Sequence, residues 1–194
     1  MADIAGKGVP AALLMANLQA NLRSQYRLAV DDLPRLLASV NRLFYENTDV
    51  ASYATLFFAD YDDSTRRLRY ANCGHLPALL LRAGATSAQC SQTAGTEWLR
   101  ATGTVLGLFE DWRCEAAEVD LAPGDTLALY TDGITEAAAG NDEEFGESRL
   151  LDALSDPCHL PAGELLQEVM GAVRQFSSGA QQDDITLVIA HCLG

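Results

Sequence analysis

The chain has 194 residues, of which 48% are hydrophobic, and its formal net charge at pH 7 is −14. The length suits one domain with a substantial core, and the apolar content excludes a disordered chain. No apolar run approaches the roughly 18 residues of a membrane helix, and the sequence lacks the clustered Lys and Arg that a nucleic-acid partner requires.

The first part of the chain is predicted to form two helices. Apolar residues recur at helical spacing over residues 9–28, and Pro10 suits the first turn, where its missing N–H costs nothing. A second helix is expected to begin after Asp32, a plausible N-cap residue, with Pro34 in its first turn.

The middle of the chain is predicted to be rich in strands. Three short runs of aromatic and aliphatic residues, separated by turn residues, are typical of an antiparallel meander. A small, polar stretch without clear period, residues 84–103, is predicted to be a loop, and three more strand candidates follow it. The six runs are 53–62, 66–74, 77–84, 104–109, 112–121 and 125–133.

The last part of the chain returns to helices. A polar, acidic loop is expected at 138–146, followed by helices at 147–155 and 161–176 and a final strand at 185–192. Strands cluster and helices cluster, which favours an α+β fold with antiparallel sheet over an alternating βαβ fold. There is no internal repeat or linker, so residues 1–194 are predicted to be a single domain.

The cysteines and the first residues bear on the compartment. The five cysteines are widely spaced and form no C-x-x-C pair, which argues against a disulfide framework and against a cysteine zinc site. The opening MADIAGKG is polar and rich in glycine, so it does not read as a signal peptide. We therefore expect reduced thiols and a cytoplasmic chain.

Three acidic junctions carry the functional signal. Asp3 precedes a glycine-rich turn that opens a helix, Asp132 follows a strand, and the pair Asp183 and Asp184 precedes one. If these junctions meet, their carboxylates need a proton or a cation between them. Oxygen ligands without a His or Cys cluster suit Mg²⁺ or Mn²⁺ rather than zinc. Two such ions, about 3.5–4 Å apart, could activate a water and neutralise a phosphate under attack.

Each junction also has an ordinary structural explanation. Asp-Gly is a common turn, a pair of aspartates before a strand can be a cap, and Asp3 can belong to a disordered terminus. Residues 101–194 contain 3 basic and 18 acidic side chains, a bias that solubility alone explains. The individual motifs therefore leave both interpretations open.

Five segments in order give a more specific signal: ADIAGKGVPAALLMA, ATLFFADYDDSTRRLRYANCGHLPALLLR, LAPGDTLALYTDGITEA, EEFGESRLL and DDITLVIA. Together they resemble the bacterial SpoIIE/RsbU-type phosphatases, a branch of the metal-dependent PP2C-like (PPM) protein phosphatases. The resemblance covers nearly the whole chain. It implies a PP2C-like αββα sandwich, antiparallel sheets flanked by helix pairs, with two Mn²⁺ or Mg²⁺ ions at one edge.

The resemblance also implies an activity and a set of site residues. The reaction would be hydrolysis of phosphoserine or phosphothreonine on a protein, usually an anti-sigma factor antagonist, by attack of a metal-bound water. The carried-over metal ligands are Asp3, Asp132 and Asp183, together with the backbone carbonyl of Ile4. Gly133 would let the backbone approach the metals, and Asp184 would support the ligands without necessarily binding metal. Lys7 is expected to be an exposed loop residue, and His75 to hydrogen-bond in a turn.

The chain departs from the family pattern at its start. The family has further strands upstream of the glycine-rich turn, one of which carries another aspartate ligand, whereas this chain begins two residues before Asp3. We therefore expect the first strands to be absent, one metal site to be weakened and catalysis to be weak. An open sheet edge would invite pairing with another chain, so a homodimer is also expected.

Three functions remain open at this point. The first is a protein phosphatase, favoured by the three aspartate motifs. The second is a catalytically weak or inactive relative that acts as a binding or signalling module, favoured by the missing upstream aspartate. The third is a two-metal phosphoesterase for small molecules, which a panel of phosphopeptides and small phosphate esters would distinguish. An upstream sensor domain is a further expected partner, acting through the helix at 11–28.

Overall fold

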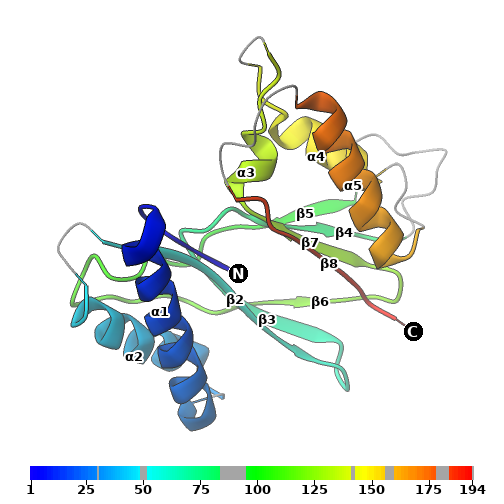
Figure 1. The fold of residues 1–194 in the computed structure, drawn as a ribbon. Helices are drawn as coiled ribbons and strands as arrows, with labels where there is room; N and C mark the ends of the chain where they lie inside the picture. Colours follow the sequence, from blue (N-terminus) through cyan, green and yellow to red (C-terminus); the bar gives the residue numbers. More distant parts are fainter. Residues whose placement is uncertain are drawn as a thin grey trace. The chain divides into compact units, whose positions relative to one another are not determined.

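The computed structural model describes residues 1–29, 31–48, 52–83, 95–140, 143–155, 160–177 and 184–193. The chain groups into two compact units, each with its own antiparallel sheet and helices (Figure 1). We call them the N-terminal unit, Met1–His75 with Arg100–Asp120, and the C-terminal unit, Leu76–Leu99 with Leu121–Gly194.

The N-terminal unit is a four-stranded antiparallel sheet with two helices packed on it. Its strand order is β1-β2-β3-β6, so β1 and β6 are the outer strands of the described sheet. The elements are β1 (Ala2–Ile4), α1 (Gly8–Ala29), α2 (Leu33–Tyr45), β2 (Ala54–Asp62), β3 (Arg67–Cys73) and β6 (Ala117–Asp120).

Helix α2 shows how the sequence builds this unit. Asp32 is its N-cap, and the Asp32 side chain accepts a hydrogen bond of 3.0 Å from the backbone N–H of Arg35, as the sequence predicts. Leucine, valine and phenylalanine side chains at spacings of three and four residues are buried on the side of the helix that faces the core. They pack with residues of β2 and β3, which fixes the helix on the sheet.

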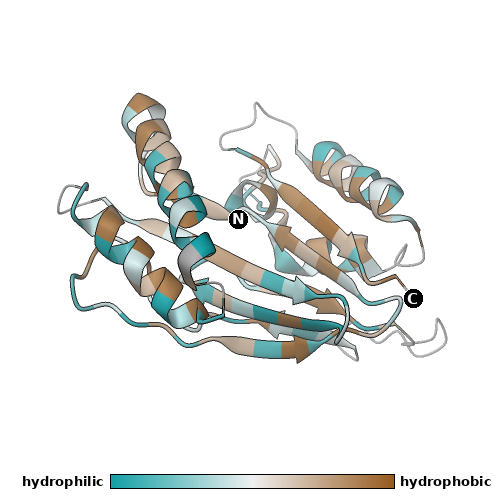
Figure 2. Ribbon diagram, turned by 90° about the horizontal axis from the view of Figure 1, so that it is seen from below, coloured by the Kyte–Doolittle hydropathy of each residue, from teal (hydrophilic) through white to brown (hydrophobic). Residues whose placement is uncertain are grey.

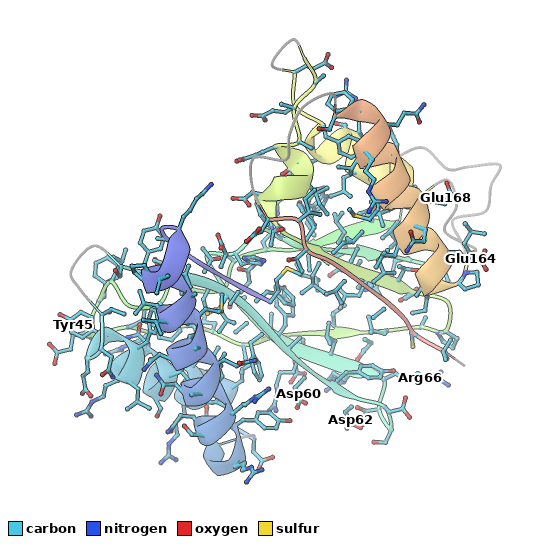
Figure 3. All side chains as sticks on the ribbon, in the orientation of Figure 1. Tyr45, Asp60, Asp62, Arg66, Glu164 and Glu168 are labelled. Carbon is cyan, nitrogen blue, oxygen red and sulfur yellow. The ribbon has the colours of Figure 1, made fainter. Side chains whose placement is uncertain are left out.

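Strands β2 and β3 form a hairpin, paired from Leu56↔Cys73 to Asp62↔Arg67. In its turn, Asp62 accepts hydrogen bonds from the backbone N–H of Ser64 at 2.9 Å and from the Ser64 hydroxyl at 2.6 Å, and these bonds lower the pKa of the Asp62 carboxyl. Arg66 takes a left-handed φ of 55° at the end of the turn (Figure 3). Local turn chemistry thus sets the hairpin register.

The C-terminal unit repeats the plan with a second four-stranded antiparallel sheet, in the order β5-β4-β7-β8. Hydrophobic and hydrophilic residues alternate along its helices (Figure 2), and the hydrophobic ones pack with β4, β7 and β8. The elements are β4 (Ala78–Leu81), β5 (Thr96–Leu99), β7 (Thr126–Tyr130), α3 (Asp132–Thr135), α4 (Gly146–Ser155), α5 (Ala162–Phe176) and β8 (Leu187–His191).

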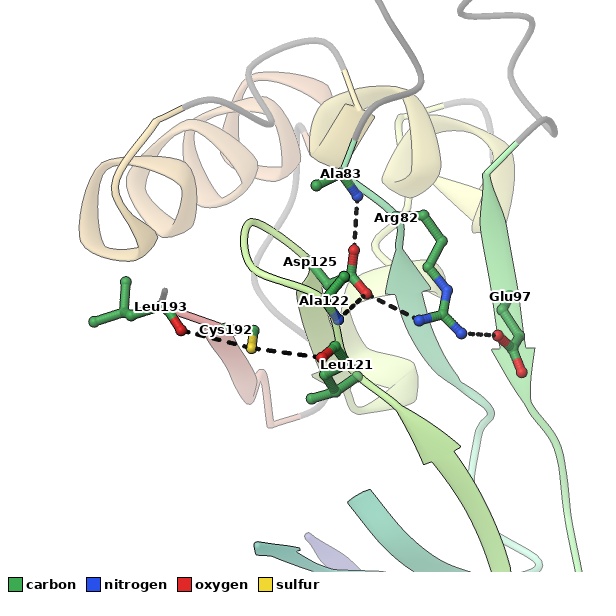
Figure 4. Close-up of polar contacts among 8 residues, drawn as sticks. All are labelled: Arg82, Ala83, Glu97, Leu121, Ala122, Asp125, Cys192 and Leu193. Carbon is green, nitrogen blue, oxygen red and sulfur yellow. Dashed lines mark hydrogen bonds and ion pairs between the residues drawn. The ribbon is translucent and has the colours of Figure 1, made fainter. Parts of the chain in front are cut away.

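A buried carboxylate fixes the start of β7. Asp125 is 2% exposed, and its side chain accepts hydrogen bonds from the Arg82 guanidinium at 2.9 Å, the Ala83 N–H at 2.8 Å and the Ala122 N–H at 2.9 Å (Figure 4). Arg82 also pairs with Glu97 on β5, at 2.6 Å. The predicted turn at 122–125 is therefore tied to the ends of β4 and β5 by a side-chain network.

The predicted fold class is confirmed: the chain is α+β, with antiparallel sheets and helix pairs. The four long helices and the final strand also lie where the sequence placed them, within a few residues. The single-domain prediction for 1–194 stays a prediction. No described helix has both the length and the apolar character needed to cross a lipid bilayer.

The predicted meander is wrong in its third strand. Strand β4 does not pair with β3; it pairs with β5 and β7 in the other sheet. The change of sheet follows Gly74, whose φ of 71° turns the chain away at the end of β3. This partner exchange joins strands far apart in the sequence, so local patterns could not predict it.

Four smaller predictions also need correction. Residues 104–109 form no strand and contribute only a β-bridge between Leu106 and Ala54. The predicted loop 84–103 contains β5, while its residues 84–94 lie outside the described residues. The candidate at 112–121 contains a strand only over its last residues, in β6, and the candidate at 125–133 ends in the short helix α3.

Candidate metal centre

Asp3 lies on the outer strand of the N-terminal unit. It pairs with Thr55 in the β1–β2 register, and its side chain is exposed. The next residue, Ile4, is 6% exposed and belongs to the core. Because side chains alternate along a strand, burying Ile4 directs Asp3 to the opposite face. The sequence did not predict this strand, which is only three residues long.

A glycine loop connects Asp3 to α1. The Ala5 N–H donates to the Tyr53 carbonyl at 2.9 Å, which holds the start of the loop on the chain before β2. Gly6 and Gly8 have φ values of 106° and 79°, and a Cβ on either would meet no atom within 4 Å. The glycines are therefore required by backbone conformation and not by crowding. Lys7 between them is exposed, as expected.

His75 supports the strand opposite Asp3. The His75 side chain shares a 2.9 Å hydrogen bond between its Nδ1 and the Thr55 hydroxyl, and its backbone N–H donates to the Asn72 side chain at 2.8 Å. The predicted role of His75 in a turn is confirmed. The contact with Thr55, which faces Asp3 across the β1–β2 pair, is an addition that sequence alone did not give.

Asp132 begins the short helix α3, directly beyond the end of β7. Its side chain is partly buried, and one carboxylate oxygen accepts a 2.9 Å hydrogen bond from the Gly133 N–H. Gly133 and Ile134 are buried behind it. Tyr130, at the end of the strand, is 1% exposed, and burial, with a smaller contribution from Glu147, raises the pKa of its phenol. The carboxylate therefore stands on a neutral, well-packed base.

Thr131 joins the Asp132 segment to the Asp184 segment. The Thr131 hydroxyl donates to the Asp184 carbonyl at 3.0 Å and accepts from the Thr186 N–H at 2.9 Å, while the Thr131 N–H donates to the Thr186 carbonyl at 3.1 Å. Thr131 occupies the N-cap position of α3, yet its side chain makes no cap hydrogen bond. We call this set of three bonds the Thr131 clasp.

The clasp brings two of the predicted junctions to the same end of the β7–β8 pair, where Tyr130 and Leu187 face each other. Sequence reasoning passed over Thr131, although a threonine at an N-cap position was a visible signal for side-chain hydrogen bonding. Asp184 is exposed. Asp183 lies outside the described residues, so its predicted place as a ligand stays a prediction.

The described residues assemble only part of the predicted ligand set. Asp132 and Asp184 lie in the C-terminal unit, and Asp3 and Ile4 in the N-terminal unit. Across the part of the chain that the structure describes, no group of three or more His, Cys, Asp or Glu side chains is gathered to hold a metal ion. The donor chemistry itself, carboxylates and a backbone carbonyl, fits a hard divalent cation.

Comparisons with known proteins agree with this arrangement. A family model described as stage II sporulation protein E (SpoIIE) matches residues 1–193. The chain is 30% identical over 199 residues to the phosphoserine phosphatase RsbU of Bacillus subtilis, covering 97% of this chain and 53% of that protein. It thus spans about half the length of that relative.

Solved structures show the same fold. The SiaA-PP2C domain of Pseudomonas aeruginosa superposes with a TM-score of 0.79 at 23% identity, covering 98% of this chain and 72% of that one. RsbX in complex with magnesium gives a TM-score of 0.63 at 13% identity, covering 97% of this chain and 77% of that one. At these identities the likeness establishes the PP2C-like fold.

Proposed function

The chain belongs to the SpoIIE family, and we propose that it is a metal-dependent protein phosphatase that hydrolyses phosphoserine or phosphothreonine on a signalling protein. The observation that carries the proposal is the Thr131 clasp, which holds the Asp184 segment against Asp132 inside a chain matched by the family model almost end to end. The RsbU relative, itself named a phosphoserine phosphatase, supports the same reaction.

The proposed cofactors are Mn²⁺ or Mg²⁺ ions, two of them in the family pattern. Asp3, Asp132 and Asp183 would bind them through carboxylate oxygens and Ile4 through its carbonyl, a ligand set suited to hard cations. The magnesium complex of RsbX, a protein of the same fold, supports this choice. When bound, such ions would supply an activated water and offset the charge of the phosphoryl group.

The remaining residues would position these ligands. Gly133 donates its N–H to the Asp132 carboxylate, which orients that side chain. The clasp fixes the backbone of Asp184, so that Asp184 would support the ligands and Asp183 would follow directly from a fixed point. The glycine loop would set the direction of Asp3. The protein would provide no covalent nucleophile, because the water takes that role.

The proposed partners follow from the family. The substrate would be a phosphorylated anti-sigma factor antagonist, met in the cytoplasm, and an upstream sensor domain would act on the chain through α1. A homodimer is a further proposal: β1 is an outer strand of its sheet, and outer strands offer unpaired backbone groups to another chain. Light scattering that finds only monomer at high concentration would contradict the dimer.

Phosphate release tests the activity. The chain would be incubated with Mn²⁺ and a panel of phosphoserine proteins, phosphopeptides and small phosphate esters. We expect release from phosphoserine in a protein, little from small esters, and loss of activity on Asp3→Asn or Asp132→Asn. Turnover of small esters alone would overturn the protein substrate, and equal activity of both variants would overturn the proposed ligands.

A second candidate is a binding module of the same fold that performs little or no catalysis. The observation that favours it is that the described carboxylates do not gather as a group of three or more. Such a module would bind the phosphoprotein without releasing phosphate, and removal of Mn²⁺ would leave its binding unchanged. A phosphatase would instead lose activity when the metal is removed.

A further inference from the structure

Two cysteines of the N-terminal unit lie on either side of one glycine. Cys73 ends β3 and forms a parallel β-bridge with Gly103, while Gly103 forms an antiparallel β-bridge with Cys114. A Cβ on Gly103 would lie 2.7 Å from the Cys114 Cβ and 3.2 Å from its Cα. Because 103 is a glycine, Cys114 can lean across this position, and the two thiols become hydrogen-bond partners.

The two thiols differ in exposure and in acidity. Cys73 is fully buried, whereas Cys114 is partly exposed. The hydrogen bond from the Cys73 thiol lowers the pKa of Cys114, and the same bond, together with burial, raises the pKa of Cys73. Cys114 is therefore the thiol that ionises first. A partly exposed thiolate beside a second thiol is the arrangement in which cysteines react with oxidants.

We propose that Cys73 and Cys114 form a peroxide-reactive pair, in which Cys114 is the attacking thiolate and Cys73 is the thiol that closes a disulfide. Cys114 and Gly103 lie outside the regular strands, so their backbone can move the short way that an S–S bond of about 2.05 Å requires. This site is independent of the proposed phosphatase activity. It lies near the β1–β2 pair, because Cys73 faces Leu56, the neighbour of Thr55.

The chemistry balances with a hydroperoxide as the oxidant. The Cys114 thiolate attacks one peroxide oxygen, the O–O bond breaks, and hydroxide or alkoxide leaves, so that Cys114 becomes a sulfenic acid. Cys73 then attacks the Cys114 sulfur, the S–O bond breaks, and the departing hydroxide takes the Cys73 proton to form water. Two thiols are oxidised by two electrons and one peroxide is reduced.

Peptide mapping tests the pair on the complete, folded chain. After treatment with a small excess of hydrogen peroxide, digestion without reductant and mass spectrometry should yield a peptide pair joined through Cys73 and Cys114. A non-reducing gel should show the chain still as one molecule. Failure to find this disulfide while both thiols remain reduced, or linkage through other cysteines instead, would overturn the proposal.

Single variants test the order of the two steps. In Cys73→Ser, dimedone should trap a sulfenic acid at Cys114, whereas in Cys114→Ser the buried Cys73 should react at least about tenfold more slowly. Cys192→Ser is the matched control, because the Cys192 thiol contacts only backbone carbonyls, those of Leu121 and Leu193, in its printed hydrogen bonds. It should leave disulfide formation unchanged. Equal reactivity of Cys73 and Cys114 would contradict the assigned roles.

Discussion

The segments around Asp3 and Asp132 hold their carboxylates in different ways. Asp3 lies on an outer strand and is followed by a loop whose glycines take positive φ values and whose Cβ positions are open. Asp132 follows a strand that side-chain hydrogen bonds fix at both ends, through Asp125 at the start and Thr131 at the end. Backbone conformation directs the first ligand, and side-chain contacts direct the second.

This difference suggests where adjustment is cheap. Moving the Asp3 segment breaks few printed contacts, since the loop contributes one hydrogen bond between Ala5 and Tyr53. Moving the Asp132 segment requires breaking the Thr131 clasp. We therefore expect the Asp132 side to be preformed before a metal binds and the Asp3 side to be set by binding.

Removing the charge at the start of β7 should have the largest effect. Asp125→Asn leaves an amide NH₂ among the donors of Arg82, Ala83 and Ala122, so a buried charge pair is broken and donors lose their acceptor. We expect a loss of about 3 kcal/mol in the free energy of unfolding, measured by urea denaturation.

The matched control is Asp120→Asn. Asp120 pairs with Arg67 at 3.1 Å, but the two side chains are 75% and 52% exposed. Exposed pairs contribute at most about 1 kcal/mol, so this variant should unfold nearly as the parent does. Equal losses for the two variants would remove the distinction between side-chain fixation of β7 and ordinary surface pairing.

The next effect concerns the clasp. Thr131→Val keeps the shape of the side chain but leaves the Asp184 carbonyl and the Thr186 N–H without the hydroxyl partner. We expect Mn²⁺ affinity, measured by isothermal titration calorimetry, to fall by about 10-fold or more, because residues that orient ligands have effects of this size.

Two variants separate this effect from general destabilisation. Thr131→Ser retains a hydroxyl and should restore most of the affinity. Thr135→Val removes a hydroxyl that bonds only to the Asp132 carbonyl, at 3.2 Å within its own short helix, and should change affinity little. If Thr131→Val and Thr135→Val weaken binding equally, the clasp has no special role.

The smallest effect distinguishes glycines by backbone conformation. Gly6→Ala forces a φ of 106° on a residue with a Cβ, so we expect a loss of about 1 kcal/mol in stability. Gly171→Ala, inside α5 with no atom within 4 Å of the added Cβ, should instead stabilise by about 0.5–1 kcal/mol. Thermal denaturation would contradict the account if both substitutions had the same sign.

The parts of the fold that depend on local chemistry were predictable. The cap at Asp32, the helical spacing in α2 and the turn before β7 are encoded within a few neighbouring residues. The move of β4 to the second sheet, and the strand β5 within a polar stretch, depend on partners distant in sequence. Alternation and turn residues carry no information about such partners.

The candidate site divides in the same way. The motifs marked Asp3, Asp132 and Asp184 as junction residues, and each lies at the end of an element or next to one. Sequence did not indicate the hydroxyl of Thr131 or the contact of His75 with Thr55, because each depends on a residue far along the chain. Residue type identified the candidate ligands, while their support required the fold.

Mn²⁺ binding, measured by isothermal titration calorimetry, tests the central claim most directly. The parent chain would be compared with Asp132→Asn and with Asp111→Asn, a control in which an 86% exposed carboxylate away from the three junctions is neutralised. The account predicts that Asp132→Asn loses at least one site while Asp111→Asn binds as the parent does. Binding that is equal in all three chains, or absent from the parent at millimolar Mn²⁺, would contradict it.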